Sequence, residues 1–305
     1  MKKIYIANFS GLANRLEALV IASLIAERWG HSIHLHWPER DALRIAGVSS
    51  GRIMPWERIG SLKLRDFDEA RLATLGEQRI ISLRSTYGPR ELQRRQVLPT
   101  AARLSIHPQI AVAIRETFAR FAGRPAVAMH LRQGDFHVAD EIYDATAHRH
   151  PAPGLWWYEH VMREYARAFP GVYFVVGYSG DAATLDGLRA QFDLVTLPPV
   201  FSYRSLLPGH RSAGHPVVDL FALACCTTLI ATPTSSFSHW AANVLGPRSR
   251  VILPPPRTTR ANPQWGIAEL TGSVVLDWRD AAERGTGVSI GGALPAPMPP
   301  VTDWL

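Results

Sequence analysis

Apolar and polar positions along this chain form two blocks, and each block predicts strands that alternate with helices. In the first block, residues 2–7 and 32–37 have the short apolar runs of buried strands. Residues 14–29 lie between them and repeat apolar side chains at helical spacing, and Gly30 predicts the end of that helix. A strand, a helix and a second strand in this order predict a parallel sheet.

The second block repeats this order with more elements. Its predicted strands and helices alternate at 127–131, 156–169, 172–177, 182–192, 194–197, 217–226, 228–231, 236–245 and 251–253. Between the blocks, 40–105 has a weaker pattern with a strand near 79–83, and 108–121 predicts a helix. Gly123-Arg124-Pro125 interrupts the chain. We therefore expect one α/β domain over 1–122 and a second over 123–305, which ends in a proline-rich tail.

Composition indicates a globular protein of the cytoplasm. Apolar residues make up 47% of the chain, enough for two packed cores. Cys225 and Cys226 are adjacent in an apolar segment, which argues against a disulfide framework and favours a reducing compartment. The apolar run 4–7 is too short for a signal peptide. We also expect no membrane span, because no run approaches the roughly 20 apolar residues that a span needs.

The chain is basic, with a formal net charge of +7 and a pI of about 9.8. This charge is compatible with nucleic acid, an anionic membrane surface or a phosphorylated small ligand. The arginines are scattered, and the densest segment, Arg90-Glu91-Leu92-Gln93-Arg94-Arg95, contains a glutamate and only three arginines. Nucleic-acid modules usually carry a basic stripe interleaved with aromatic residues, so we expect no nucleic-acid partner.

Polar residues follow the predicted strand 127–131 at the position where ligands bind in parallel α/β sheets. The side chains of His130 and Arg132 point to the same side of the strand, whereas that of Leu131 points back to the core. Gly134 permits a turn, and Asp135 adds a carboxylate. This cluster suits a phosphate-bearing ligand whose reaction develops negative charge. The alternative is a histidine at the core edge beside a surface arginine.

Two predicted helix starts offer further phosphate contacts, because amides at the start of a helix point toward bound anions. Gly11, Asn14 and Arg15 belong to the loop before the first helix, where Asn14 is alternatively an ordinary N-cap. The segment Thr232-Pro233-Thr234-Ser235-Ser236-Phe237-Ser238-His239 opens a later helix. Serine is also a favoured N-cap, but five hydroxyls in the seven residues 232–238 exceed what capping requires.

Several carboxylates are candidates for catalysis or binding. Asp140 and Glu141 follow Asp135, and any of the three is a candidate general base, although each also fits a solvated loop. Asp219 lies within an apolar helix and matches the paired donors of a guanine edge, or else it is a local cap. The Asp-x-Asp triplet at 66–68 has a pattern that some glycosyltransferases use to hold a metal ion. We expect instead that it begins a helix, where the helix dipole favours acidic residues. His148 and His150 lack the accompanying ligands of a metal site, so we expect none.

With these motifs placed, the chain resembles the fucosyltransferase superfamily, which includes the α1,2-, α1,6- and protein O-fucosyltransferases and the rhizobial nodulation enzymes. The likeness is dense in three blocks: Gly11-Leu12-Ala13-Asn14-Arg15, His130-Leu131-Arg132-Gln133-Gly134-Asp135, and the stretch from Asp219-Leu220-Phe221-Ala222-Leu223 to Thr234-Ser235-Ser236-Phe237.

The resemblance implies a GT-B fold, an α/β class with two Rossmann-like, doubly wound domains facing a cleft. It implies metal-independent, inverting transfer from GDP-fucose, without a further cofactor, and a donor held mainly by the second domain. Arg132 would then contact the pyrophosphate, His130 would support the donor site and Asp219 would read guanine. The remaining donor contacts implied in this way are Gly11, Asn14, Arg15, Thr234, Ser235, Ser236 and Phe237.

Two alternatives remain open at this stage. The first is a GT-B enzyme that uses another nucleotide sugar, and the second is a nucleotide- or glycan-binding protein without catalysis. The acceptor stays equally open among glycans, lipid-linked glycans and small molecules.

Overall fold

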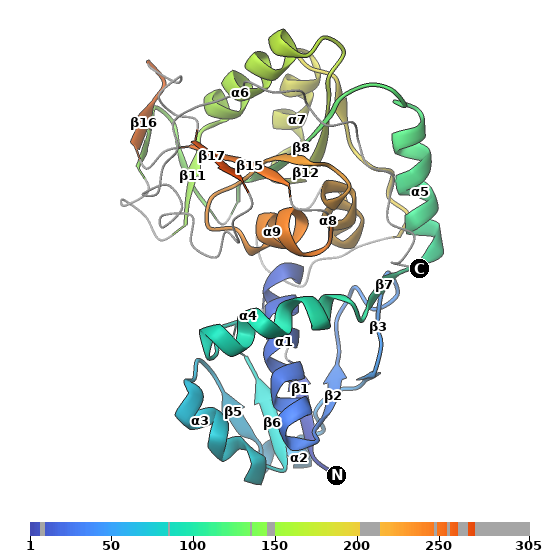
Figure 1. Ribbon diagram of the computed structural model, residues 1–305, viewed down its shortest axis with the longest axis vertical. Helices are drawn as coiled ribbons and strands as arrows, with labels where there is room; N and C mark the ends of the chain where they lie inside the picture. The colour runs from blue at the N-terminus through green and yellow to red at the C-terminus, as the bar shows by residue number, and fades with distance from the viewer. Residues whose placement is uncertain are drawn as a thin grey trace. The chain divides into compact units, whose positions relative to one another are not determined.

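The computed structural model describes residues 1–6, 10–84, 86–134, 136–144, 150–201, 214–246, 249–254, 257–261 and 268–271, the last as backbone only. These residues form two compact units, and each contains a parallel β-sheet with helices (Figure 1). Unit 1 is Met1–His107, and unit 2 begins at Pro108. The predicted α/β class with two Rossmann-like domains is confirmed. No helix in the described part of the chain is long and apolar enough to cross a bilayer.

Unit 1 is built on a parallel sheet with the strand order β4-β2-β1-β6-β5. β3 and β7 form a separate antiparallel pair. The elements in chain order are β1 (Lys3–Ile6), α1 (Leu12–Trp29), β2 (Ser32–Leu35), β3 (Leu43–Ile45), β4 (Val48–Ser50), α2 (Pro55–Ile59), β5 (Leu62–Leu64), α3 (Glu69–Thr74), a 3₁₀ turn (Leu75–Glu77), β6 (Ile80–Leu83), α4 (Arg90–Ala101) and β7 (Leu104–Ile106).

The end of α1 follows from its sequence. Gly30 adopts a left-handed φ of 72° and donates its backbone N–H to the carbonyl of Ala26, as the glycine predicted. The start of α1 differs from the prediction, because the helix begins at Leu12 and Gly11 occupies the N-cap. Helix α1 is buried along most of its length, since the sheet packs on one side of it and α4 on another.

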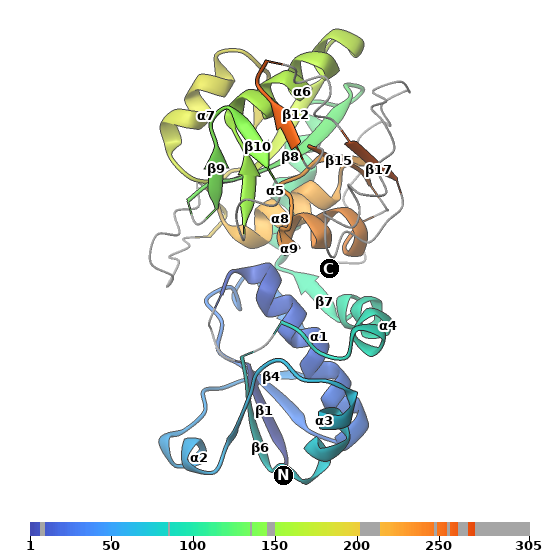
Figure 2. The same cartoon turned by 90° about the vertical axis from the view of Figure 1, so that its left-hand side faces the viewer.

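The two faces of the unit 1 sheet differ in polarity. Ile4, Ile33 and Ile81 are register partners on neighbouring strands and are buried on the α1 side. Tyr5, one residue further along β1, points to the opposite face. Of the described helices of unit 1, only the short α2 lies on that face, whereas α1, α3 and α4 lie on the other (Figure 2). A polar face of the sheet is therefore left partly open.

Unit 2 contains a larger sheet with the strand order β13-β12-β8-β14-β15-β17, parallel except for the edge strand β17. Its elements are α5 (Pro108–Ala119), β8 (Ala126–Arg132), β9 (His137–Ala139), β10 (Ile142–Asp144), β11 (Pro151–Pro153), α6 (Leu155–Ala168), β12 (Tyr173–Ser179), α7 (Ala182–Arg189), β13 (Leu194–Val195), α8 (Pro216–Ala224), β14 (Thr228–Ile230), α9 (Ser236–His239), a π-helical segment (Trp240–Val244), β15 (Arg250–Leu253), β16 (Arg257–Thr259) and β17 (Ala268–Thr271).

Helices cover both faces of this sheet, with α6 and α7 on one side and α8 and α9 on the other (Figures 1 and 2). Leu131 of β8 belongs to the apolar core with Val161 of α6 and Leu185 of α7. On the opposite face, Gly177 of β12 leaves room for α8, because a Cβ there would lie 2.9 Å from a methyl carbon of Leu223. The glycine in the middle of a strand thus marks a close approach by a helix.

The boundary between the units lies before α5, whereas the sequence placed it at residue 123, after this helix. Helix α5 contacts α8, so it is part of unit 2. The Gly123-Arg124-Pro125 break ends the connection from α5 to β8 rather than a domain. Glycine and proline residues in the sequence mark the ends of helices, but the unit to which a helix belongs depends on its packing.

Gly154 precedes α6 and is packed against the backbone of β9, so we expect Gly154→Ala to destabilise unit 2. A Cβ at this position would lie 2.2 Å from the carbonyl oxygen of Ala139, which cannot move without disturbing the strand. The expected loss in the free energy of unfolding is about 1–3 kcal/mol, measured by urea denaturation. Gly187→Ala is the matched control, because nothing lies within 4 Å of the added carbon in α7. Equal stability of the two variants would contradict this account.

Candidate donor-binding site

His130 lies at the carboxyl end of β8 and faces away from the core, as the alternation of the strand predicted. Its Nδ1 lies 2.8 Å from the Ser238 hydroxyl, and its ring stacks on Phe237 with a centroid distance of 4.8 Å. Both partners belong to α9, which follows the next strand of the sheet. The structure therefore brings two of the predicted motifs, the His130 segment and the Ser235 segment, into direct contact.

Thr232 joins the same two segments through its side chain. Its hydroxyl donates to the carbonyl of His130 at 2.8 Å and accepts the backbone N–H of Arg132 at 3.1 Å. The hydroxyl of Tyr158, a buried residue of α6, lies 3.1 Å from the same oxygen. These bonds continue the β8–β14 ladder beyond Ile230, because a side chain replaces the missing backbone partner. Arg132 is consequently anchored beside the start of α9.

The loop before α9 has an uncommon backbone and two hydroxyls without partners. Thr234 has a φ of 58°, a left-handed conformation that a β-branched residue rarely adopts. Ser235 occupies the N-cap of α9, but its side chain makes no capping bond. The hydroxyls of Thr234 and Ser235 are buried and have no hydrogen-bond partner among the described residues. Local strain and unsatisfied polar groups together are typical of a ligand site.

We call His130, Thr232, Thr234, Ser235, Phe237 and Ser238 the β8–α9 cluster. Sequence analysis assigned roles to four of them but not to Thr232 and Ser238. Both lie inside the segment that was singled out, yet a strand-to-strand bond is not visible in a local pattern. Gly177, directly opposite His130 on β12, was also missed, although a glycine within a strand signals a close approach.

The buried ring of His130 is expected to stay neutral across the physiological range. Burial lowers its pKa to about 3, and the nearby Arg132 guanidinium acts in the same direction. The ring proton signals of His130, assigned by their loss in His130→Gln, should therefore not shift between pH 8 and pH 5 in NMR spectra. In the urea-denatured chain, the same histidine should titrate near its ordinary value of about 6.5. A native-state titration above pH 5 would refute the buried position.

Arg132 is the last residue of β8 and is bonded through its backbone to Thr232 of the cluster. Its side chain is half-buried, and its guanidinium lies over the ring of Phe136, 4.7 Å from the centroid. Gly134 follows with a φ of 82°, which confirms the predicted turn. The ring orients the guanidinium by a cation–π contact, and a planar guanidinium fork suits the geometry of a diphosphate.

Asp219 lies on α8, on the same face of the sheet as His130. It is 8% exposed, and burial raises the pKa of its carboxyl to about 7. A local capping role is not needed, because His215 is the N-cap and accepts the N–H of Val217. Gly214 lies against the carboxylate, since a Cβ on it would be 2.8 Å from Oδ1. A buried carboxylate with a raised pKa is typical of a functional site.

The candidate general bases are not gathered in the cluster. Asp140 and Glu141 are exposed at the turn between β9 and β10. The backbone carbonyl of Glu141 accepts the N–H of Arg260, which ties this turn to β16. Asp135 lies outside the described residues. Asp135, Asp140 and Glu141 therefore all stay candidates for the general base.

Arg15 has a different environment from the predicted one. It is 1% exposed, its guanidinium forms an ion pair with the buried carboxylate of Glu39, and it lies over the ring of Trp37. Sequence analysis overlooked Glu39, which follows β2. Since a buried arginine needs a counter-ion, this pair organises unit 1 rather than presenting an open guanidinium.

Gly11 and Asn14 lie in the loop that leads into α1. The interpretation of Asn14 as an N-cap is wrong, because Gly11 holds that position, and the amide of Asn14 donates to the hydroxyl of Ser10 at 2.7 Å. Gly11 has nothing within 4 Å of an added Cβ, so the backbone is open to a ligand on that side.

The Asp-x-Asp triplet begins a helix, as sequence analysis favoured. Asp68 is the N-cap of α3 and accepts the N–H of Arg71 at 2.8 Å. Among the described residues, no group of three His, Cys, Asp or Glu side chains is arranged to hold a metal ion. His148 lies outside the described residues, and the ring of His150 packs against Phe136.

Comparison with known proteins adds information at the level of fold. No protein-family model matches the chain, and no curated protein matches it. Among solved structures, NodZ alpha-1,6-fucosyltransferase soaked with GDP-fucose gives a TM-score of 0.53 at 17% identity, covering 90% of this chain and 100% of that chain. An arginine-to-lysine mutant of Arabidopsis thaliana FUT1 in complex with GDP gives 0.52 at 14%, covering 96% and 80%. The chain has the fold of these fucosyltransferases.

This result confirms the predicted resemblance and the GT-B fold class. NodZ co-crystallised with GDP gives a further match, with a TM-score of 0.50 at 17% identity over 83% of this chain and 94% of that chain. At such identities the likeness concerns the backbone, so the role of each side chain is argued from its own contacts.

Proposed function

We propose that the protein is an inverting, metal-independent glycosyltransferase that moves fucose, or a close sugar, from GDP-fucose or a similar GDP-sugar to an acceptor hydroxyl. The observation that carries this proposal is the β8–α9 cluster beside Arg132, in which the buried hydroxyls of Thr234 and Ser235 have no hydrogen-bond partner among the described residues. Such donors at the start of a helix suit a diphosphate. The bound states named for the fucosyltransferases of like fold, GDP and GDP-fucose, support the same ligand.

The cluster supplies stabilisation where charge develops during transfer. The acceptor oxygen attacks C1 of fucose from the side opposite the leaving phosphate, the bond from C1 to the phosphate oxygen breaks, and GDP departs with the electron pair. Arg132 donates to the departing diphosphate, and the hydroxyls of Thr234 and Ser235, with the amide of Ser236, are the further donors. Preorganised donors of this kind lower the barrier without a metal.

Asp219 and Phe237 would hold the nucleotide base. An ionised carboxylate accepts two parallel N–H donors, which is the pattern that a guanine edge presents and that uracil and thymine lack. Phe237 is half-buried and already stacks on His130, so its ring is held in one orientation. Removal of the acceptor proton falls to Asp135, Asp140 or Glu141 in this scheme. Gly11 and Asn14 remain predicted donor contacts.

The proposal includes the cytoplasm as the place of action, supported by Cys225 and Cys226, which are both buried thiols. The acceptor is a glycan, free or lipid-linked, or a small molecule that carries a hydroxyl.

Nucleotide-dependent thermal stabilisation tests the proposal. GDP should raise the melting temperature at concentrations where UDP and dTDP do not, because binding to the native state adds RT ln(1 + [L]/Kd) to its stability. Release of fucose from GDP-fucose should persist in EDTA. Stabilisation by UDP or dTDP alone would instead assign another nucleotide sugar. GDP binding without any turnover of GDP-fucose, even to water, would favour a non-catalytic binding protein.

A further inference from the structure

A second polar site lies in unit 1, on the sheet face that α1 does not cover. A pocket of about 490 Å³ opens there at the carboxyl ends of the parallel strands. The pocket is lined by the hydroxyls of Ser61 and Ser82 and by four basic side chains: Arg52, Arg58, Lys63 and Arg84. No Asp or Glu lines the pocket.

The sheet itself explains why this pocket is polar. Ser49, His34, Tyr5, Ser82 and Lys63 are successive register partners across β4, β2, β1, β6 and β5. They therefore form one row on one face, whereas the rows on either side of it point to α1. Apolar side chains would be expected here if a helix covered the sheet as in a three-layer domain. The polar row instead indicates a face that meets water or a ligand.

The positive charge of the pocket is not neutralised within the described part of unit 1. Arg52, Arg58, Lys63 and Arg84 are all exposed, and none of them forms an ion pair with a described residue. Several other arginines of the chain have carboxylate partners three or four residues away on a helix. Four unpaired cations around one hollow generate a local positive potential.

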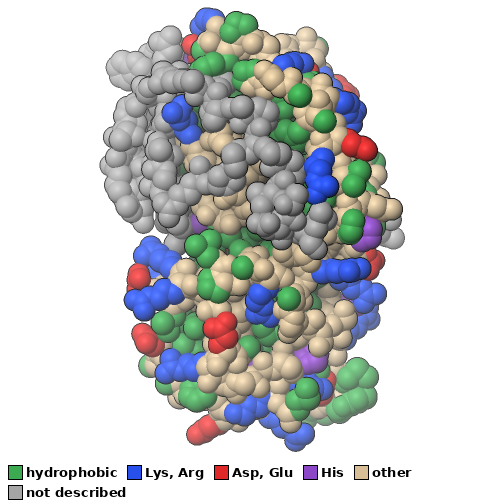
Figure 3. Space-filling view, turned by 45° about the vertical axis from the view of Figure 1, so that its right-hand side comes forward, with side chains coloured by type: hydrophobic (Ala, Val, Ile, Leu, Met, Phe, Trp, Pro, Cys, Tyr) green, Lys and Arg blue, Asp and Glu red, His purple; other side chains and the backbone are tan. Residues whose placement is uncertain are grey.

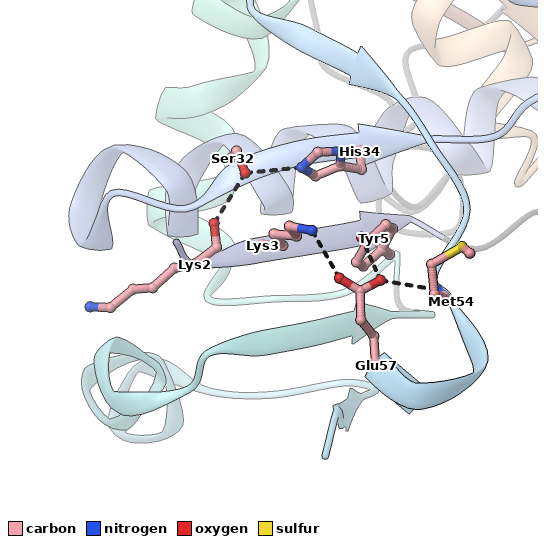
Figure 4. Close-up of polar contacts among 7 residues, drawn as sticks. All are labelled: Lys2, Lys3, Tyr5, Ser32, His34, Met54 and Glu57. Atoms are coloured by element: carbon pink, nitrogen blue, oxygen red, sulfur yellow. Dashed lines mark hydrogen bonds and ion pairs between the residues drawn. The ribbon is translucent and has the colours of Figure 1, made fainter. Parts of the chain in front are cut away.

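Glu57 of α2 is close in sequence to these cations, but its carboxylate is already occupied (Figure 4). Lys3 Nζ lies 2.9 Å from one oxygen, and the hydroxyl of Tyr5 and the N–H of Met54 donate to the other at 2.8 and 3.0 Å. The hydrogen bond from Lys3 is the largest cause that holds the pKa of Glu57 at about 2. Glu57 thus fastens α2 to the sheet and leaves the four cations uncompensated.

We propose that this basic pocket, which is lined only by residues of unit 1, binds the phosphate group of a ligand. The guanidinium forks of the three arginines and the Lys63 ammonium match the charge of a phosphate, and Ser82 offers a hydroxyl donor. None of the residues that line it is among the proposed donor contacts, so the proposal does not depend on the transfer reaction.

The rim of the pocket points to two sources of that phosphate. Three apolar side chains on and beside α2 are exposed to solvent: Met54 at 42%, Trp56 at 66% and Ile59 at 90%. Figure 3 shows hydrophobic and basic side chains interspersed on the face of unit 1 that it presents. Exposed aromatic and aliphatic groups beside cations suit a lipid headgroup at a membrane surface. A phosphorylated molecule in solution would use the cations alone.

The first test is calorimetric titration of the full chain with inorganic phosphate. We expect saturable binding that weakens by about tenfold or more in Lys63→Gln/Arg84→Gln and that weakens with added salt. Arg28→Gln/Arg95→Gln is the matched control, because it removes the same charge from exposed positions of unit 1 on α1 and α4. This control should bind phosphate as the unsubstituted chain does.

The second test is cosedimentation with vesicles of phosphatidylcholine, with and without phosphatidylglycerol. Binding only to the anionic vesicles, lost in Lys63→Gln/Arg84→Gln and in Trp56→Ser/Ile59→Ser, would identify a lipid headgroup as the source. Phosphate binding without vesicle binding would identify a free phosphorylated molecule.

The absence of both saturable phosphate binding and anionic-vesicle binding would overturn the proposal. Equal losses in the pocket variant and in the Arg28→Gln/Arg95→Gln control would overturn it as well, because net charge would then explain the result. The GDP-dependent thermal shift should be unchanged in all these variants. Failure of the phosphate site and failure of the donor site are therefore distinguishable.

Discussion

Arg132→Lys is expected to lower kcat for transfer from GDP-fucose by about 10²–10³-fold, with no change in fold. Lysine keeps the positive charge but loses the planar fork that can donate two parallel bonds to a diphosphate. It also loses the flat stacking on Phe136 that holds the guanidinium in place. The effect should fall on kcat more than on KM, because the contact strengthens as the phosphate gains charge. Steady-state release of GDP from GDP-fucose measures both constants.

The control for Arg132→Lys is Arg163→Lys on α6. Arg163 is also an arginine of unit 2, but its guanidinium pairs with Glu159 on the helix surface, 3.0 Å away. Its substitution should leave kcat within about twofold, since exposed pairs contribute little. If Arg132→Lys turned over as fast as this control, Arg132 would not stabilise the leaving group.

Asp219→Asn is expected to have two opposite effects. The free energy of unfolding should rise at alkaline pH, and the affinity for GDP should fall. Burial raises the pKa of the native carboxyl to about 7 from an ordinary value of 3.8. Between these values the folded chain binds more protons than the unfolded one, so stability falls as pH rises from about 4 to about 7 and stays lower above that. A difference of about 3 pKa units corresponds to about 4 kcal/mol, part of which asparagine would recover.

The binding effect of Asp219→Asn has the opposite sign. A carboxylate accepts both N–H donors of guanine, whereas an amide offers one acceptor and presents its own donor to the base. We expect GDP affinity to fall by about tenfold or more, and the affinity of the unsubstituted chain to rise with pH through about 7.

Melting temperatures at pH 5 and pH 8, together with GDP titrations, measure the two effects. Asp186→Asn serves as the control, because Asp186 lies exposed on α7 and pairs with Arg189. A variant that lost stability at pH 8 would show that Asp219 is a structural anchor. Unchanged GDP affinity would remove it from the base-recognition site.

Local patterns predicted most of unit 2 because its elements are short, regular and interrupted by clear breaks. Strands 127–131 and 251–253 were predicted within about one residue of β8 and β15. The first part of unit 1 was equally readable through Gly30. Within residues 40–105, the strand near 79–83 was predicted and is confirmed as β6. Strands β3, β4 and β5 were not predicted, because each has three residues and little periodicity.

The candidate site was readable only in part, and the reason differs between residues. His130 and Arg132 stand out because two polar side chains end an apolar strand. Ser235 stands out through the run of hydroxyls, although a favoured N-cap explained it equally well until its capping bond proved absent. Arg15 was predicted to contact the donor, because its ion-pair partner could not be recognised in the sequence. That partner, Glu39, lies 24 residues away on a segment without a recognisable pattern.

The α/β class, the order of the elements and the orientation of His130 opposite Leu131 were all predictable from the chain, because these properties follow from local periodicity. Only the tertiary structure decided that Ser238, 108 residues after His130, holds its ring, and that Thr232 bonds the end of β8. It also decided that one face of the unit 1 sheet stays polar and open. These contacts depend on which strands become neighbours and in which register, and that choice is made by long-range packing rather than by any local pattern.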